Sequence, residues 1–172
     1  MLVYVMAAIV RTAMDVDAIR LRRGELSPKV ARSLRRALCT LHTLETMAVN
    51  IYQYQITTEP CELNRYLIAA MCNEMTHLQD FQVKLYEYGW KPSRTRWMYW
   101  IVGLVFGLLS RIRGRRGILR MGVWVETKAV QHYGELLEGI PWDDETRRIV
   151  EKNRADEESH VARWRQLLAA EG

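Results

Sequence analysis

Two short patterns in this sequence each place a glutamate three residues before a histidine. They are Glu74-Met75-Thr76-His77 and Glu157-Glu158-Ser159-His160. Residues three apart share one face of an α-helix, so each pattern can direct a carboxylate and an imidazole at one point. One such pattern alone is common and weak, because a surface salt bridge explains most of them.

A lone glutamate precedes each pattern by about 30 residues, Glu45 before the first and Glu126 before the second. That interval fits most of one helix, a turn and the start of the next, so we expect two helical hairpins. This arrangement builds a di-iron or di-manganese carboxylate site inside a four-helix bundle. By analogy with such bundles, Glu74 and Glu157 would bridge two metals. The predicted metal ligands are Glu45, Glu74, His77, Glu126, Glu157 and His160.

The composition suits one helical domain. The chain has 172 residues, of which 49% are apolar and only 10 are glycine, so it can bury a sizeable core. A net charge of +5 is compatible with an anionic membrane surface or with nucleic acid. No binding motif and no interleaving of aromatic with basic residues is visible, so we expect no nucleic-acid partner. Three cysteines without C-x-x-C spacing predict free thiols in a reducing, cytoplasmic compartment.

The first 39 residues are expected to form a basic and apolar N-terminal extension, and residues 40–172 a single metal-binding domain. Residues 1–10 are apolar, but no basic residue precedes them and no convincing cleavage site follows, so we expect no signal peptide. The stretch is too short to span a bilayer. It would form a disordered end, a packed end or an interfacial anchor.

Hydrophobic periodicity predicts four bundle helices, at about residues 27–57, 61–88, 117–137 and 143–169. In each, apolar residues recur at steps of three and four, which marks one buried helix face. Pro60, Gly89 and Pro141 separate these segments. Glu45 lies within the apolar stripe of its helix, where a carboxylate is costly unless it is paired or bound to a metal.

Residues 97–109 are apolar on every side and carry no charge. A transmembrane helix needs roughly 20 such residues, so we predict an additional crossover helix at a membrane interface. Aromatic residues at its start and an arginine cluster after its end favour that position. The alternative is a central bundle helix followed by a solvated basic loop. The cluster consists of Arg111, Arg113, Arg115, Arg116 and Arg120.

Tyr133 is the residue predicted to act beside the metals. It lies two helical turns after Glu126, on the same face and about 10 Å along the axis. It would hydrogen-bond a substrate or relay an electron or proton, unless it is an ordinary core tyrosine. His132 is either a partner of a metal ligand or an exposed histidine. His42 precedes Glu45 by three residues, a spacing that could bring it to the edge of the site, but we expect it to have no part in the site.

The residues together resemble the demethoxyubiquinone hydroxylases, the Coq7 or Cat5 group of ferritin-like di-iron proteins. The resemblance covers roughly residues 40–168. It separates the chain from plain ferritins through Glu126 with His132-Tyr133 and through the apolar segment. The stretches that carry it are Asn50-Ile51-Tyr52 after Glu45, residues 74–81, Pro92, Glu126 with His132-Tyr133, and residues 156–160.

This resemblance implies an all-α, ferritin-like four-helix bundle with the additional crossover helix. It implies a peripheral membrane monooxygenase that hydroxylates the ring of a quinone-biosynthesis intermediate with O2. Two Fe ions, for which Mn is the alternative, would be the metals, and NADH or a quinol would supply electrons. The implied partners are a membrane lipid surface, on its cytoplasmic face, and a lipid-binding protein; a second copy of the chain is a further candidate. It also implies a role for Tyr133 near the metals.

The sequence departs from the family pattern around its first ligand. The usual Asp-His-Ala-Gly-Glu run is here Leu41-His42-Thr43-Leu44-Glu45, so a bulky Leu44 replaces a glycine beside the first metal. Two other functions remain compatible with the residues. One is a rubrerythrin- or ferroxidase-like enzyme acting on peroxide or iron, although no C-x-x-C rubredoxin site is present. The other is a non-catalytic, membrane-associated helical scaffold.

Overall fold

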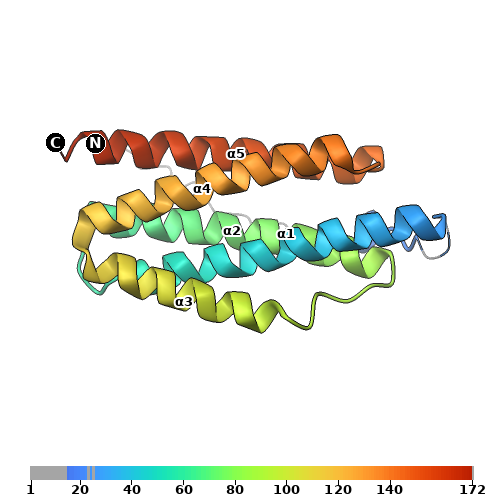
Figure 1. Cartoon of the computed structure of the whole chain (residues 1–172), viewed down its shortest axis with the longest axis horizontal. Helices are drawn as coiled ribbons and strands as arrows, with labels where there is room; N and C mark the ends of the chain where they lie inside the picture. Colours follow the sequence, from blue (N-terminus) through green and yellow to red (C-terminus); the bar gives the residue numbers. More distant parts are fainter. Residues whose placement is uncertain (1–14, 23, 25, 172) are drawn as a thin grey trace, which may run out of the picture.

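The computed structural model describes residues 15–22, 24 and 26–171, which form five α-helices and no strand (Figure 1). The apolar residues 1–10 lie outside this described part. The predicted bundle helices correspond to α1, α2, α4 and α5, and the crossover helix to α3. Their bounds are α1 Pro28–Gln55, α2 Glu62–Glu87, α3 Arg96–Ile112, α4 Gly114–Gly139 and α5 Asp144–Ala169, with a short 3-10 helix η1 at Val16–Ala18.

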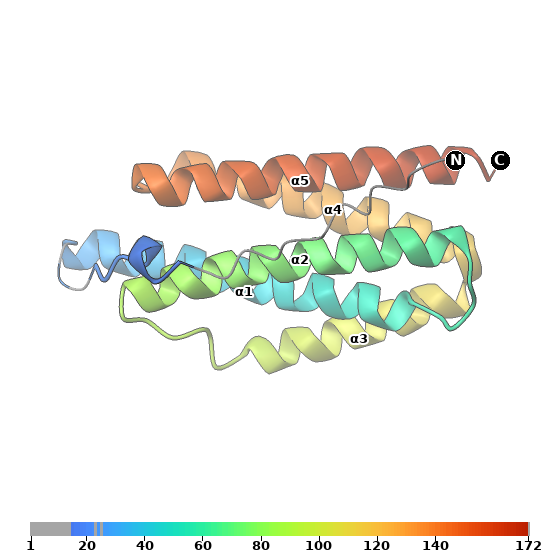
Figure 2. The same cartoon turned by 180° about the vertical axis from the view of Figure 1, so that it is seen from behind.

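The helices form a ferritin-like bundle of two hairpins. α1 packs along α2, and α4 packs along α5, while contacts of α1 with α4 and of α2 with α5 join the two pairs (Figure 2). α1 begins with Ser27 as its N-cap and Pro28 in its first turn, which is the position proline prefers. It runs without interruption through residues 39 and 40, across the predicted boundary between the N-terminal extension and the metal-binding domain.

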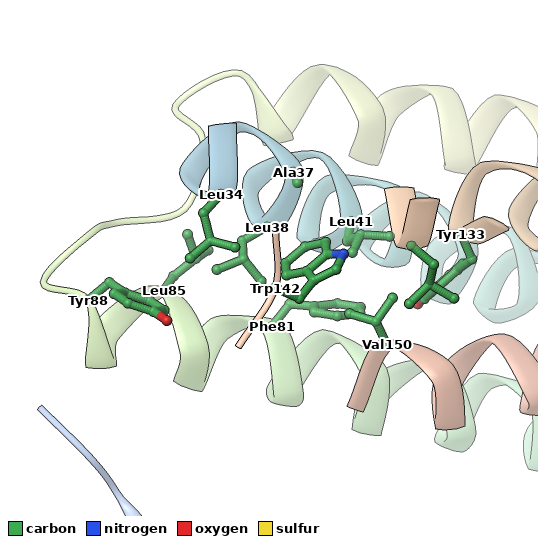
Figure 3. Packing of buried hydrophobic residues seen from close by; sticks show 11 residues of the cluster. Leu34, Ala37, Leu38, Leu41, Phe81, Leu85, Tyr88, Tyr133, Trp142 and Val150 are labelled. Atoms are coloured by element: carbon green, nitrogen blue, oxygen red, sulfur yellow. The ribbon is translucent and has the colours of Figure 1, made fainter. Parts of the chain in front are cut away.

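The apolar core is divided into two clusters along the bundle. One cluster is built around Leu38, Phe81 and Val150, at the end where α2 finishes and α5 begins (Figure 3). The other is built around Leu67 and Trp164 toward the opposite end. On each bundle helix, the predicted metal ligands lie between the residues of these two clusters. The polar site is therefore closed off along the bundle axis by packed apolar side chains.

Helix α3 lies on the outside of the bundle, against α1. A Cβ added at Gly103 would lie 2.5 Å from the Met47 carbonyl oxygen, and one at Gly107 would lie 2.7 Å from that of Ile51. Only glycine therefore allows this close approach of the two backbones. The alternative of a central bundle helix is wrong, because the larger apolar side chains of α3 point outward. Its exposed residues are Trp97, Met98, Tyr99, Trp100, Ile101, Val102, Val105, Leu108, Leu109 and Ile112.

The arginine cluster after α3 is not a loop. Only Arg113 separates α3 from α4, and the turn uses Gly114 with a positive φ of 68°, a conformation that glycine adopts at little cost. Arg115 and Arg116 then lie in the first turn of α4, where they contact Glu171 at the end of α5. None of the helices in the described part of the chain has the length and apolar character needed to cross a bilayer.

Candidate metal centre

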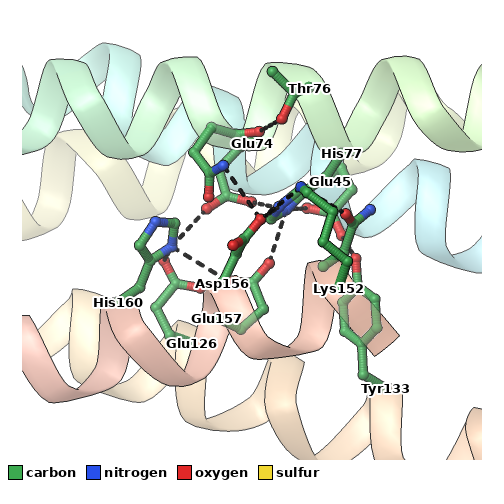
Figure 4. Close-up of polar contacts among 12 residues, drawn as sticks. Glu45, Glu74, Thr76, His77, Glu126, Tyr133, Lys152, Asp156, Glu157 and His160 are labelled. Atoms are coloured by element: carbon green, nitrogen blue, oxygen red, sulfur yellow. Dashed lines mark hydrogen bonds and ion pairs between the residues drawn. The ribbon is translucent and has the colours of Figure 1, made fainter. Parts of the chain in front are cut away.

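All six predicted ligands converge in the middle of the bundle (Figure 4). α1 and α4 each contribute one glutamate, and α2 and α5 each contribute a Glu-x-x-His pair. Five of the six residues are at most 3% exposed, and His160 is the most accessible of the set. The periodicity explains this convergence, because each glutamate occupies a core position of its own helix.

The six side chains form two interlocking groups that can each hold a metal ion. The first combines Glu45 and His77 with the two shared glutamates, Glu74 and Glu157. The second combines Glu126 and His160 with the same two glutamates. Within each group one ligand atom per residue lies within 4.8 Å of the others. Two metal positions that share a pair of carboxylates are the arrangement of di-iron and di-manganese bundles.

Several buried atoms of this cluster lie close to one another but form no hydrogen bond. His160 Nδ1 lies 3.1 Å from Glu74 Oε1 and 3.5 Å from Glu157 Oε2. Nevertheless these three atoms, and Glu157 Oε1, make no hydrogen bond. Buried polar atoms that make no hydrogen bond are costly, and these are directed at a common centre. Carboxylate oxygens with imidazole nitrogens suit iron or manganese, so the residues fit a centre of two such ions.

The pKa values show how strongly the cluster stabilises positive charge. Burial and the neighbouring carboxylates raise the pKa of Glu45 well above its usual value, and that of Glu126 to about 8. Burial would lower the pKa of the two histidines, but the adjoining glutamates outweigh it. They raise the pKa to about 11 for His77 and about 12 for His160. Divalent cations would take the place of these protons.

Two tyrosines hold the unshared glutamates, and they do so crosswise. The Tyr133 hydroxyl, on α4, donates to Glu45 Oε1 on α1 at 2.5 Å. The Tyr52 hydroxyl, on α1, donates to Glu126 on α4 and accepts from Trp164 Nε1 at 3.1 Å. Tyr133 therefore contacts the glutamate of the other hairpin. The sequence analysis gave Tyr52 no role at the site beyond the family resemblance, although it follows Glu45 by the same two turns that separate Tyr133 from Glu126.

A cavity of about 390 Å³ lies beside the cluster, between α1 and α4. Glu45 and Tyr133 form part of its wall, together with the apolar residues Leu44, Met47 and Trp124. Trp124 also makes an edge contact with Phe106 of α3, at 5.9 Å between ring centroids. The cavity thus joins the polar cluster to the side of the bundle that α3 covers.

Of the two additional histidines, one lies at the cavity and the other lies away from it. His132 lines the cavity and its Nδ1 lies 3.7 Å from Glu135. His42 is buried, but its Nε2 lies 3.4 Å from Gln82 Oε1 on α2. It is part of neither metal-binding group and does not line the cavity.

Comparison with protein families gives a match over most of the chain. The family model described as "Ubiquinone biosynthesis protein COQ7" matches residues 32–169. This chain belongs to the COQ7 family. The matched region begins within α1 and ends with α5, so it contains every residue of the cluster.

Curated relatives carry one common name, 3-demethoxyubiquinol 3-hydroxylase. The protein of that name from Polaromonas sp. is 32% identical over 143 residues, which are 81% of this chain and 68% of the relative. That from Pseudomonas putida is 28% identical over 139 residues, 80% of this chain and 65% of the relative. That from Legionella pneumophila is 27% identical over 122 residues, 70% of this chain and 57% of the relative. The chain therefore spans about two thirds or less of the length of these relatives.

Proposed function

We propose that this COQ7-family protein is a di-iron monooxygenase that hydroxylates the ring of a quinone-biosynthesis intermediate similar to 3-demethoxyubiquinol. The observation that carries the proposal is the pair of interlocking Glu/His groups beside a largely apolar cavity. The names of the curated relatives support the substrate class. A ferroxidase or peroxidase would not require a cavity suited to an apolar ring.

Each part of the site has a proposed task. Glu74 and Glu157 would bridge the metals, and each remaining glutamate and histidine would complete one metal position. Bound iron would supply the activation of O2, with electrons from NADH or a quinol; manganese is the alternative that the ligand set accepts. Tyr133 keeps its hydroxyl proton, because burial and the nearby Glu45 raise its pKa well above 10. That hydroxyl fixes the orientation of Glu45 at the wall of the cavity.

We further propose that the protein attaches to a membrane surface through α3. The outward apolar face of this helix is too large to be an ordinary exposed surface. A basic cluster lies at each of its ends, and basic residues beside an apolar helix suit anionic lipid headgroups. The cluster at the start of α3 lines one hollow and consists of Arg32, Arg35, Arg36, Lys91 and Arg94. The cluster at its end includes Arg113, Arg116 and Arg120, which line a second hollow.

An apolar substrate would then enter the cavity from the lipid. Trp124 supports this route, because it lines the cavity and touches Phe106 of α3. Leu44 also lines the cavity, so its bulk is expected to restrict which ring or tail fits. The lipid-binding partner protein and a second copy of the chain remain proposals for which the described residues supply no separate argument.

The first test is metal content, measured on the purified chain beside Glu74→Ala and His160→Ala. About two irons per wild-type chain, as di-iron bundles hold, are expected, with loss in both variants. Glu158→Ala is the matched control, because Glu158 is exposed and pairs with Arg154 outside the cluster.

Activity is then measured on the iron-loaded chain with a demethoxyquinol, a reductant and ¹⁸O2. Mass spectrometry should find one ¹⁸O atom in the product. Turnover of peroxide or Fe²⁺ without quinol oxidation would favour a rubrerythrin- or ferroxidase-like enzyme instead. A chain that binds no metal would leave the scaffold alternative.

A further inference from the structure

We propose that Asp156 is a positioning residue that holds His77 and makes the two metal positions unequal, so that they fill in sequence. This inference rests on the proposed function, namely that the cluster binds two metal ions. It concerns a residue outside the predicted ligand set, on the outer side of one imidazole ring.

The contacts of His77 distinguish its two ring nitrogens. Nδ1 faces the cluster, 3.1 Å from Glu157 and 3.3 Å from Glu74. Nε2 faces the other way and lies 3.0 Å from Asp156 Oδ2 (Figure 4). A carboxylate there accepts a hydrogen bond from Nε2–H and leaves the Nδ1 lone pair directed at the metal position. Asp156 also accepts from Lys152 Nζ at 2.8 Å, which fixes the carboxylate in turn.

His160 has no equivalent support. Its Nδ1 also faces the cluster, but Nε2 makes no hydrogen bond to any of the described residues. This difference between the two histidines follows from the residue that precedes the glutamate of each Glu-x-x-His pair. Asp156 directly precedes Glu157, and the residue that directly precedes Glu74 is Asn73. The Asn73 amide lies 3.5 Å from Asp156 Oδ2.

The two histidines are therefore unequal ligands. A carboxylate behind a metal-binding imidazole fixes its tautomer and ring orientation and makes the inner nitrogen more basic. Removal of such a partner typically costs 10- to 100-fold in metal affinity. We infer that the position formed with Glu45 and His77 binds its ion more tightly than the position formed with Glu126 and His160.

Anaerobic titration of the metal-free full chain with Co²⁺, followed by its visible absorption, tests this inference. The wild type should bind two ions in two resolved steps. His77→Ala should remove the tighter step, and His160→Ala the weaker one. Asp156→Asn should weaken the tighter step by about 10- to 100-fold, so that the steps merge.

Two further variants separate this effect from a general one. Glu158→Gln removes the same charge from an exposed position two residues away, so both steps should remain. Lys152→Met removes the partner that fixes the Asp156 carboxylate and should weaken the tighter step by less than Asp156→Asn does, with the weaker step unchanged. Thermal melting of each metal-free variant establishes that it is folded. Lys152 has an exposed side chain, so Lys152→Met keeps the test valid if Asp156→Asn does not fold.

The outcomes distinguish this inference from the proposed function. Two equal steps in the wild type, or two steps that Asp156→Asn leaves unchanged, would overturn the role of Asp156 and leave the two-metal site intact. A wild-type chain that binds no ion would overturn the proposed function and this inference with it.

Discussion

Two hydroxyl groups tie the hairpins together at the scale of single residues. Tyr133 on α4 holds Glu45 on α1, and Tyr52 on α1 holds Glu126 on α4. Each hydroxyl occupies one lone pair of a buried carboxylate, which would otherwise lack a donor on that side. The crosswise pattern means that neither hairpin can present its unshared glutamate correctly without the other.

Tyr133→Phe should therefore destabilise the metal-free chain. The substitution leaves Glu45 Oε1 buried without its donor, a loss that costs about 1 to 3 kcal/mol. Urea unfolding followed by circular dichroism measures the change in free energy of unfolding. Tyr66→Phe is the control, because its hydroxyl bonds Glu62 at 3.2 Å in an exposed position. A loss no larger than that of the control would mean that the bond to Glu45 contributes nothing.

The convergence of the six candidate ligands was predictable from the sequence, whereas the residues that hold them in place were only partly so. Glu45 and Glu126 can be recognised in the sequence because each is a carboxylate at a core position of its helix. Helical spacing alone puts each Glu-x-x-His pair on one face. Spacing along α4 put Tyr133 on the face of Glu126, two turns away, but it cannot reveal that the hydroxyl bonds Glu45 across the bundle. Asp156 was missed for the same reason, since its partner His77 lies on another helix.

At the scale of elements, two glycines allow α3 to pack closely against α1. Gly107→Ala would place a Cβ 2.7 Å from the Ile51 carbonyl oxygen, and backbone atoms cannot move aside cheaply. Such overpacking costs about 1 to 3 kcal/mol. The free energy of unfolding measures the loss. Gly139→Ala is the control, because nothing lies within 4 Å of its added Cβ, so it should be neutral or mildly stabilising. Equal effects of both changes would argue against close α1–α3 packing.

The start of α5 gives the fold a dependence on pH. Asp143 caps this helix by accepting from Thr146 N at 3.0 Å. Burial would raise the pKa of Asp143, but hydrogen bonds from Thr146 and Tyr88 and the charge of Arg22 outweigh it. They lower the pKa from 3.8 to about 2. Because the folded pKa is depressed, the stabilisation is complete above about pH 4 and is lost as the pH falls toward 2.

Asp143→Ala should cost about 0.5 to 2 kcal/mol at neutral pH, as the loss of an N-cap does. The difference from wild type should shrink between about pH 4 and pH 2, where the wild-type carboxylate itself becomes protonated. Urea unfolding at several pH values measures it. Asp144→Ala, one residue further on, removes a charge from the same helix end without the capping bond, and should cost less. A difference that stays constant down to pH 2 would contradict the low pKa.

The bounds of the helices followed from sequence signals, but the position of α3 did not. Proline and glycine at residues 28, 60, 89 and 141 stop or start helices for local steric reasons. A helix that is apolar on every side has no period that marks a buried face. Only the small residues at 103, 107 and 110 indicate which side meets the bundle, and this can be recognised only once the position of α1 is known.

At the scale of the whole molecule, the cavity connects the candidate metal centre to the α3 side of the bundle, and a basic cluster lies at each end of α3. Lys91 and Arg94 precede α3, while Arg113 and Arg116 follow it, so positive charge flanks both ends of the apolar face. A helix that lies in the plane of a bilayer interface needs its two ends at the same depth. Charge at both ends favours that orientation over insertion by one end.

Binding to sedimenting lipid vesicles should therefore require both the apolar face and anionic lipid. Trp97 and Ile101 are 60% and 44% exposed on α3, one helical turn apart. Replacing both with serine should reduce binding at least tenfold, because burying such a side chain contributes about 1.5 to 3 kcal/mol. Ile68→Ser is the control: Ile68 is 45% exposed on α2, away from α3, and its loss should leave binding unchanged. Vesicles without anionic lipid, or about 1 M salt, should weaken binding of the wild type by screening the arginines. If the doubly substituted chain sediments with vesicles as the wild type does, α3 is not the attachment surface, and the apolar substrate must reach the cavity by another route.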